Sequence, residues 1–224
     1  MRTPADFVQT HRHRPANGAV YLVASSLLLV AFPLVRPFTD RSHNPAEVAD
    51  AFASAPWLIA HILGGLGFVL LPVGLLALYI FLQGSRVEHR AFQGLVVSWI
   101  GIGLMLPTVL GTEPFGLRAI GQAAIQQGNT DLLAIASAIR SGPQARFFFP
   151  GLVVLAIGAV LIAVAVWNSG TLPRWSGVIF AIGLALFFPL FPRVIRVADG
   201  LLIGIGGVWI AWSILLYKGQ SEAR

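Results

Sequence analysis

Long apolar runs dominate this 224-residue sequence and set the strongest limit on its fold. An α-helix needs about 17–25 mainly apolar residues to cross the hydrocarbon core of a bilayer. Backbone polar groups inside a bilayer have to bond to one another, so runs of this length predict spanning helices. The sequence therefore predicts an all-α, polytopic transmembrane helical bundle of about six helices, forming a single integral membrane domain over residues 1–224. The predicted spans are 17–35, 57–82, 91–111, 147–167, 175–191 and 197–217.

The composition agrees with a membrane protein and excludes several other classes. Hydrophobic residues make up 56% of the chain and charged residues 11%, whereas a soluble domain carries about 25% charged residues. The net charge is +6, but the basic residues are scattered singly over the predicted loops. They indicate membrane topology rather than a nucleic-acid partner. The absence of cysteine excludes disulfides, thiolate metal sites and thiol nucleophiles.

Basic residues in short loops predict the orientation of the bundle. One side carries eight of them and the other seven, and acidic residues offset the charge of the second side. We therefore predict that both termini lie in the cytoplasm. Arginine supplies almost all of the basic residues in a chain rich in alanine and glycine, which favours a bacterial plasma (inner) membrane. The predicted cytoplasmic set is Arg2, Arg12, Arg14, Arg86, Arg90, Arg174, Lys218 and Arg224.

Aromatic residues lie at several predicted helix ends. Trp57, Trp167, Trp175 and Tyr217 occupy such positions. An amphipathic ring is favoured at the level of the lipid headgroups. We predict that these four side chains are interfacial anchors.

Two segments on the predicted outer side contain helical signals of their own. Asn44, Pro45 and Glu47 form a helix-start signature, which predicts a short helix up to about Ser54. The segment 114–146 has apolar residues at helical spacing, interrupted at 128–130. It predicts two short amphipathic helices that lie along the interface. All of these short helices are expected to cover the outer mouth of the bundle.

Ionisable side chains at the membrane edge are the candidate functional residues. His61 shares a helix face with Gly64, Gly65 and Phe68, so it is expected to point toward other helices. Glu113 precedes Pro114, which is expected to end the third helix there. Both groups then lie at the outer end. The candidate binding residues are His61, Glu113, Arg118, Arg193 and Asp199, the last two in the turn before the sixth span together with Arg196.

Several chemistries fit this set of side chains. A histidine and a carboxylate can relay protons or act as acid and base, and arginine can hold a lipid phosphate or an organic anion. A purely structural polar cap also fits, in which Glu113 pairs with Arg118 or Arg193 and Asp199 caps the sixth helix. No HExxH motif, second deep histidine or GxSxG motif is present. The sequence therefore predicts no metal site and no cofactor, and it leans against an enzyme.

Short motifs spread over the chain carry a family resemblance. They are Ser54-Ala55-Pro56-Trp57-Leu58-Ile59-Ala60-His61-Ile62-Leu63-Gly64-Gly65, Gly74-Leu75-Leu76-Ala77-Leu78-Tyr79, Gly111-Thr112-Glu113-Pro114-Phe115-Gly116 and Leu172-Pro173-Arg174-Trp175-Ser176-Gly177. The chain resembles a set of uncharacterised bacterial six-helix integral membrane proteins, especially from actinobacteria, that share a domain of unknown function. The resemblance implies the same architecture, with His61 and Glu113 as the two polar marks of the group.

The leading functional prediction is a multi-pass membrane protein that binds or transports a small molecule or lipid at its outward-facing polar mouth. Two alternatives stay open. One is an intramembrane enzyme acting on a lipid or isoprenoid, and the other is a structural subunit of a membrane complex. The predicted partners are the lipid bilayer, a small-molecule or lipid ligand, and either further copies of the chain or a larger complex.

Overall fold

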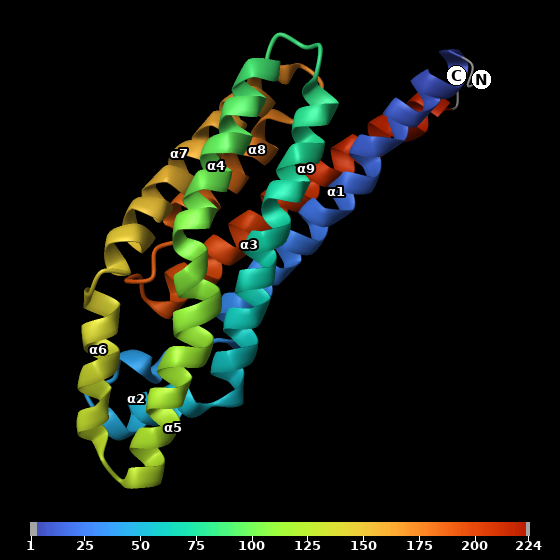
Figure 1. Cartoon of the computed structure of the whole chain (residues 1–224). Coiled ribbons are helices and arrows are strands. Elements are labelled where there is room, and N and C mark those ends of the chain that lie inside the picture. Colours follow the sequence, from blue (N-terminus) through green and yellow to red (C-terminus); the bar gives the residue numbers. More distant parts are fainter. Residues whose placement is uncertain (1–3, 223–224) are drawn as a thin grey trace.

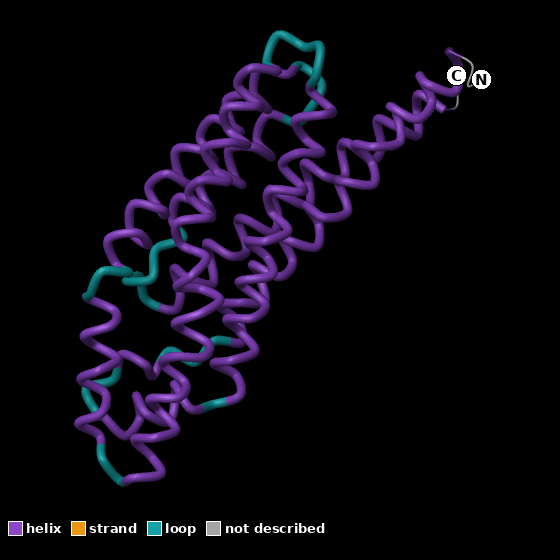
Figure 2. Tube along the Cα trace, in the orientation of Figure 1, coloured by secondary structure: helices purple, strands orange, loops and turns teal. Residues whose placement is uncertain are grey.

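The computed structural model describes the backbone of residues 4–222 and the side chains of residues 17–39 and 41–217. Over this range the chain contains helices and no strand, which confirms the all-α class (Figure 2). The side chains of Arg2, Arg12, Arg14, Lys218 and Arg224, used above for orientation, lie outside the described residues. The elements are α1 (Pro4–Val35), η1 (Thr39–Arg41), α2 (Pro45–Ala53), α3 (Ala55–Leu82), α4 (Glu88–Pro107), η2 (Thr108–Leu117), α5 (Arg118–Gln127), η3 (Thr130–Leu132), α6 (Leu133–Ser141), α7 (Ala145–Ser169), α8 (Arg174–Leu186) and α9 (Arg193–Glu222).

Five helical stretches within the described range are long and apolar enough to cross a bilayer. The span predicted at 175–191 corresponds to α8, which has 13 residues and ends at Leu186. A helix of that length rises roughly 20 Å, about 10 Å less than the hydrocarbon core. The chain leaves the helix at Phe187, and Pro189 and Pro192 cannot supply the N–H groups that a continuing helix would need. The sixth membrane helix is therefore a partial one.

The long helices form a closed ring in chain order. Each of α1, α3, α4, α7, α8 and α9 packs on the next, and α9 closes the ring on α1. The centre is filled by buried side chains such as Leu75, Leu155 and Phe180. Ser25 on α1 also donates a hydrogen bond of 2.8 Å to the carbonyl of Gly67 on α3. Five helical stretches are long and apolar enough to span a bilayer, so their outer faces contact lipid. The protein is therefore a multi-pass membrane protein.

Glycine allows α4 and α7 to approach closely. Substitutions of two glycines on α4, one at the contact with α7 and one away from it, test this packing. A Cβ on Gly101 would lie 2.8 Å from the Gly151 carbonyl oxygen, whereas a Cβ on Gly103 would meet nothing within 4 Å. We expect Gly101→Ala to lower the free energy of unfolding by about 1–3 kcal/mol, because the two backbones have to separate. Gly103→Ala is the matched control and should be neutral or slightly stabilising. Unfolding in mixed detergent micelles measures both, and equal stability of the two variants would contradict the packing described.

The helices α2, α5 and α6 gather at one end of the ring, which we call the capped end (Figure 1). The predicted short helix at Pro45 is confirmed as α2, and the Asn44 side chain accepts a hydrogen bond of 3.1 Å from the Ala46 N–H. The segment 114–146 also contains two short helices, α5 and α6. Of these, α5 prolongs the axis of α4 instead of starting as a separate interfacial helix (Figure 1).

The expectation that Pro114 ends the third helix was wrong. The helix continues from α4 through η2, a π-helix of 10 residues, into α5. Proline lacks the N–H that a regular helix needs, and its ring collides with the preceding turn. The chain accommodates Pro114 by widening the helix locally rather than by ending it. Glu113 therefore lies within a π-helical segment, a type of helix that is often found at functional sites.

Trp57 was predicted as an interfacial anchor, and this was wrong. Its side chain is fully buried, packed with Phe52 and Leu117 in a small cluster beneath the capped end. The Ser54 side chain accepts a hydrogen bond from the Trp57 N–H, so Trp57 lies in the first turn of α3. The rings of Trp175 and Tyr217 are exposed, as expected for anchors, and that of Trp167 is about one third exposed.

Candidate functional site

A cavity of about 260 Å³ lies at the capped end of the ring. Every helix of the ring, or the segment that prolongs it, contributes to its wall. The apolar part of the wall is largely aromatic, with Phe32, Phe68, Phe148, Phe149 and Phe187. The ionisable side chains on the wall are His61, Glu113, Arg36, Arg41, Arg140 and Arg196.

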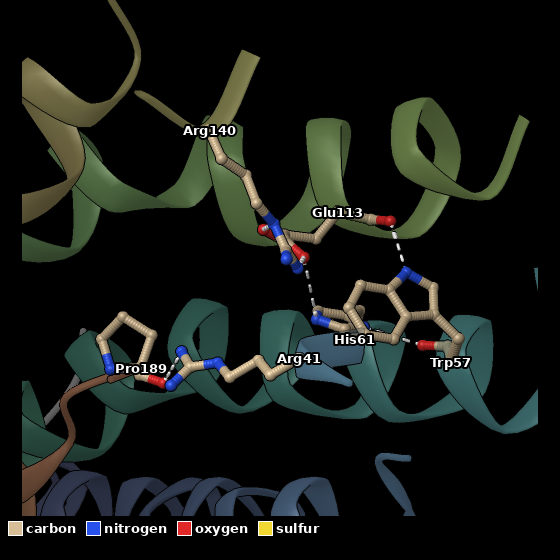
Figure 3. A network of polar contacts seen from close by, with 6 residues as sticks. All are labelled: Arg41, Trp57, His61, Glu113, Arg140 and Pro189. Atoms are coloured by element: carbon tan, nitrogen blue, oxygen red, sulfur yellow. Dashed lines mark hydrogen bonds and ion pairs between the residues drawn. The ribbon is translucent and has the colours of Figure 1, made fainter. Parts of the chain in front are cut away.

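Glu113 and Arg140 form an ion pair with two hydrogen bonds. Arg140 Nε donates to Glu113 Oε1 at 3.2 Å, and Arg140 Nη2 donates to Oε2 at 2.9 Å (Figure 3). The guanidinium also lies 4.9 Å from the centre of the Phe52 ring and 5.6 Å from that of Trp57. The partner of Glu113 is therefore Arg140 on α6, rather than Arg118 or Arg193 as the polar-cap hypothesis expected. This pair ties α6 to the π-helical segment.

His61 and Glu113, the two residues singled out by the sequence, do lie together. His61 Nε2 is 3.7 Å from Glu113 Oε2, and the buried imidazole stacks against Trp57 with ring centres 4.3 Å apart. His61 Nδ1 is 2.8 Å from the Trp57 carbonyl oxygen. Because a carbonyl can only accept, Nδ1 carries the proton, and the lone pair of a neutral His61 then lies on Nε2. That nitrogen faces the Glu113 carboxylate (Figure 3).

Trp57 links these groups to the backbone. Its indole Nε1–H donates to the Glu113 carbonyl oxygen at 2.6 Å (Figure 3). The guanidinium of Arg36 lies 4.9 Å from the centre of the Trp57 ring, which Arg140 also contacts. One buried indole thus fixes the position of Glu113 and contacts two of the arginines on the cavity wall.

A second ion pair, Arg196 with Asp199, lies on α9. Arg196 Nη1 donates to Asp199 Oδ2 at 3.0 Å, and the two side chains are 4% and 0% exposed. The expectation that Asp199 caps the sixth helix was wrong, because α9 begins at Arg193 and Asp199 lies in its second turn. Arg196 lines the cavity, and its guanidinium stacks on Phe187 at 4.1 Å. Asp199 acts on the cavity only through Arg196.

Arg118 and Arg193 were expected at the site, but neither lines the cavity. Arg193 stacks its guanidinium over Phe38 at 5.7 Å. Arg118 is half-buried on α5, and its Nε has no hydrogen-bond partner among the described residues. The cavity wall instead carries Arg36, Arg41 and Arg140, none of which was among the candidate binding residues.

Arginine outnumbers carboxylate on the cavity wall by four residues to one. Arg41 donates to the carbonyl oxygen of Pro189, an uncharged acceptor, so this bond leaves its positive charge unneutralised (Figure 3). The charges of Arg36 and Arg41 both act on Arg196, which they repel. An anion in the cavity would relieve that repulsion. Among the described side chains, no three histidine, aspartate or glutamate residues gather closely enough to hold a metal ion.

Comparisons of the chain with protein-family models, with curated proteins and with solved structures find no match. The resemblance to bacterial six-helix membrane proteins stays a prediction from the sequence motifs. The function is therefore argued from the cavity itself.

Proposed function

We propose that this multi-pass membrane protein binds an anion, either a small molecule or the headgroup of a lipid, in the cavity at its capped end. The observation that carries the proposal is the convergence of Arg36, Arg41 and Arg196 from α1, η1 and α9 on one aromatic-lined cavity. A guanidinium presents several N–H donors in a plane and matches phosphate or carboxylate oxygens. The surrounding phenylalanine rings exclude water, which strengthens such charged hydrogen bonds.

His61 and Glu113 have a supporting part in this proposal. Glu113 pairs with Arg140, as Asp199 pairs with Arg196, so the two carboxylates offset two of the four arginine charges on the cavity wall. His61 Nε2 can add a donor to the site when it is protonated, or accept a proton when it is neutral. The leading prediction from the sequence is thereby revised, because Arg36, Arg41 and Arg196 replace Arg118 and Arg193 as the groups that attract the anion. The bacterial plasma membrane and cytoplasmic termini remain part of the proposal.

Native mass spectrometry of the detergent-solubilised protein tests anion binding. Phosphatidylglycerol and phosphatidylcholine with identical chains are added separately, and their affinities are compared. Both lipids carry a phosphate, but the choline cation of phosphatidylcholine offsets that charge and is repelled by the arginines, so we expect phosphatidylglycerol to bind at least about tenfold more tightly. Arg41→Gln should reduce that affinity by a similar factor, because it removes a cationic donor from the mouth of the cavity.

Arg86→Gln is the matched control for Arg41→Gln. Arg86 is also exposed and also donates to a backbone carbonyl, that of Asn168 at 3.0–3.1 Å, but it lies in the α3–α4 turn at the opposite end of the ring. We expect its loss to leave phosphatidylglycerol binding unchanged. Equal affinity for the two lipids, or equal effects of the two variants, would overturn the proposal.

The geometry of His61 also favours a second candidate function, acid–base catalysis on a bound ligand. The Trp57 carbonyl holds His61 Nδ1–H and so fixes the ring, and Nε2, at the cavity wall, carries the lone pair that a general base needs. Membranes containing the wild type or Glu113→Gln can be compared by lipid mass spectrometry. A lipid consumed only in the presence of the wild type would establish turnover, and identical lipid profiles would exclude it for the lipids present.

A further inference from the structure

A groove of about 390 Å³ runs between α7 and α8 on the outer surface of the ring. All of the side chains that line it are apolar, among them Val153, Ile157, Val160 and Ala185. The three α7 residues in this group are more than half exposed, as expected for a surface that faces lipid chains. The groove is therefore open to the hydrocarbon core of the bilayer.

The groove and the cavity meet at a layer of phenylalanine rings. Phe187 lines both hollows. The ring of Phe149, on the cavity wall, lies 5.6 Å from the ring of Phe188, which lines the groove. Phenylalanine side chains thus form part of the boundary between the two hollows, and we expect rotation of these rings to connect them.

The shortness of α8 explains why the hollows meet here. After Leu186 the ring has no regular helix between α7 and α9, and residues 187–192 take its place. Non-helical backbone at membrane depth is tolerated where it is buried in protein or lines a cavity. Phe187, Pro189 and Leu190 of this segment do line the cavity. On this side, the wall of the ring is non-helical at the depth where α8 ends.

We infer that the ligand is an anionic lipid whose headgroup occupies the cavity and whose hydrocarbon chain leaves between α7 and α8 along the groove. This inference rests on the proposed function. At about 260 Å³ the cavity is smaller than the roughly 300–1,000 Å³ of sites that enclose a whole drug-sized ligand. It suits a headgroup, and the apolar groove at its edge suits the attached chain.

The two parts of the site have different energetic roles. Lipid chains are as apolar as the leucine and valine side chains of a membrane protein, so moving a chain from the bilayer into the groove gains little hydrophobic free energy. The arginines then supply the affinity, and the groove selects a ligand by shape, admitting headgroups that carry a membrane-embedded chain. Filling the groove should therefore block the chain without changing the charge of the cavity.

Photoreactive hexadecyl phosphates in phosphatidylcholine nanodiscs test the path of the chain. One probe carries a diazirine beside the phosphate and the other carries it near the chain end, and hexadecanol with the same diazirines is the uncharged reference. Mass spectrometry locates the labelled residues. We expect the phosphate-end probe to label the cavity wall near Phe148 and Phe187. The chain-end probe should label α7 at Val153, Ile157 and Val160 at least several-fold more than bilayer-facing residues of α3.

Ala185→Phe and Val69→Phe form a matched pair for this experiment. Ala185 is exposed and lines the groove, whereas Val69 is exposed on α3 away from it. We expect Ala185→Phe to abolish the excess labelling of α7 by the chain-end probe and Val69→Phe to leave it unchanged. Chain-end labelling spread evenly over the ring, with the cavity still labelled by the phosphate-end probe, would overturn the chain path alone. Cavity labelling no stronger than with hexadecanol would overturn the anionic lipid as the ligand and, with it, the lipid-headgroup form of the proposed function.

Discussion

Asp199→Leu is expected to lower the free energy of unfolding by about 3–5 kcal/mol, because it leaves the Arg196 guanidinium buried without its counter-ion. Neither side chain of this pair is more than 4% exposed, so water cannot replace the lost carboxylate. The stacking of Arg196 on Phe187 holds the guanidinium at the cavity and prevents it from turning toward solvent. Unfolding by sodium dodecyl sulfate in mixed micelles, followed by tryptophan fluorescence, measures the change.

The double variant Arg196→Met, Asp199→Leu separates the loss of a partner from the loss of the pair. Replacing both members of a buried ion pair with apolar residues of similar volume is often neutral or stabilising. We therefore expect the double variant to regain most of the stability lost in Asp199→Leu, and to bind phosphatidylglycerol more weakly than the wild type does because Arg196 is gone. Wild-type stability of Asp199→Leu would show that Arg196 is not buried as described.

Trp57→Ala is expected to cost a similar amount, about 3–5 kcal/mol. The fully buried indole packs against Phe52 with ring centres 4.9 Å apart and lies in the cluster that includes Leu117 and Ala136. Its loss would open a cavity between the long helices and the short helices of the capped end. We expect the helices α2, α5 and α6 to loosen first, so trypsin should cleave at Arg118 and Arg140 faster than in the wild type.

Two further substitutions serve as controls for Trp57→Ala. Trp57→Phe keeps an aromatic ring and removes the N–H that donates to the Glu113 carbonyl, so it should cost only about 1 kcal/mol. Trp175 is 60% exposed, and Trp175→Ala should change stability by less than about 0.5 kcal/mol. If Trp57→Ala cost no more than Trp175→Ala, the buried position of Trp57 would be contradicted.

The membrane helices could be predicted because their signal is local. A run such as 57–82 needs only its own apolar residues to indicate a span, and α3 covers it with two extra residues at the start. Hydropathy does not report where a helix breaks, so 175–191 looked continuous although the chain leaves the helix after Leu186. Hydropathy also does not distinguish a tryptophan at the lipid headgroups from one buried under the short helices of the capped end. For that reason Trp57 was wrongly predicted to be an interfacial anchor.

The candidate site could be predicted only in part. His61 and Glu113 stood out because each is an ionisable residue at the end of an apolar run, and the structure brings them within 3.7 Å. Arg140 lies 27 residues after Glu113, and its approach depends on the paths of η2, α5 and α6, which no local pattern contains. The π-helical turn around Glu113 was missed for a related reason, since Pro114 in the sequence indicates a helix end.

The chain-order ring has a consequence for biosynthesis. During translation each new membrane helix can pack on the one that has just left the ribosome, because neighbours in the chain are neighbours in the ring. The contact between α1 and α9 is the exception and has to wait for the end of synthesis. Arg196 belongs to α9, so a nascent chain cannot hold an anion with its full set of arginines before its last helix inserts. Asp199 travels on that same helix, which enters the bilayer already carrying the counter-ion of its own arginine.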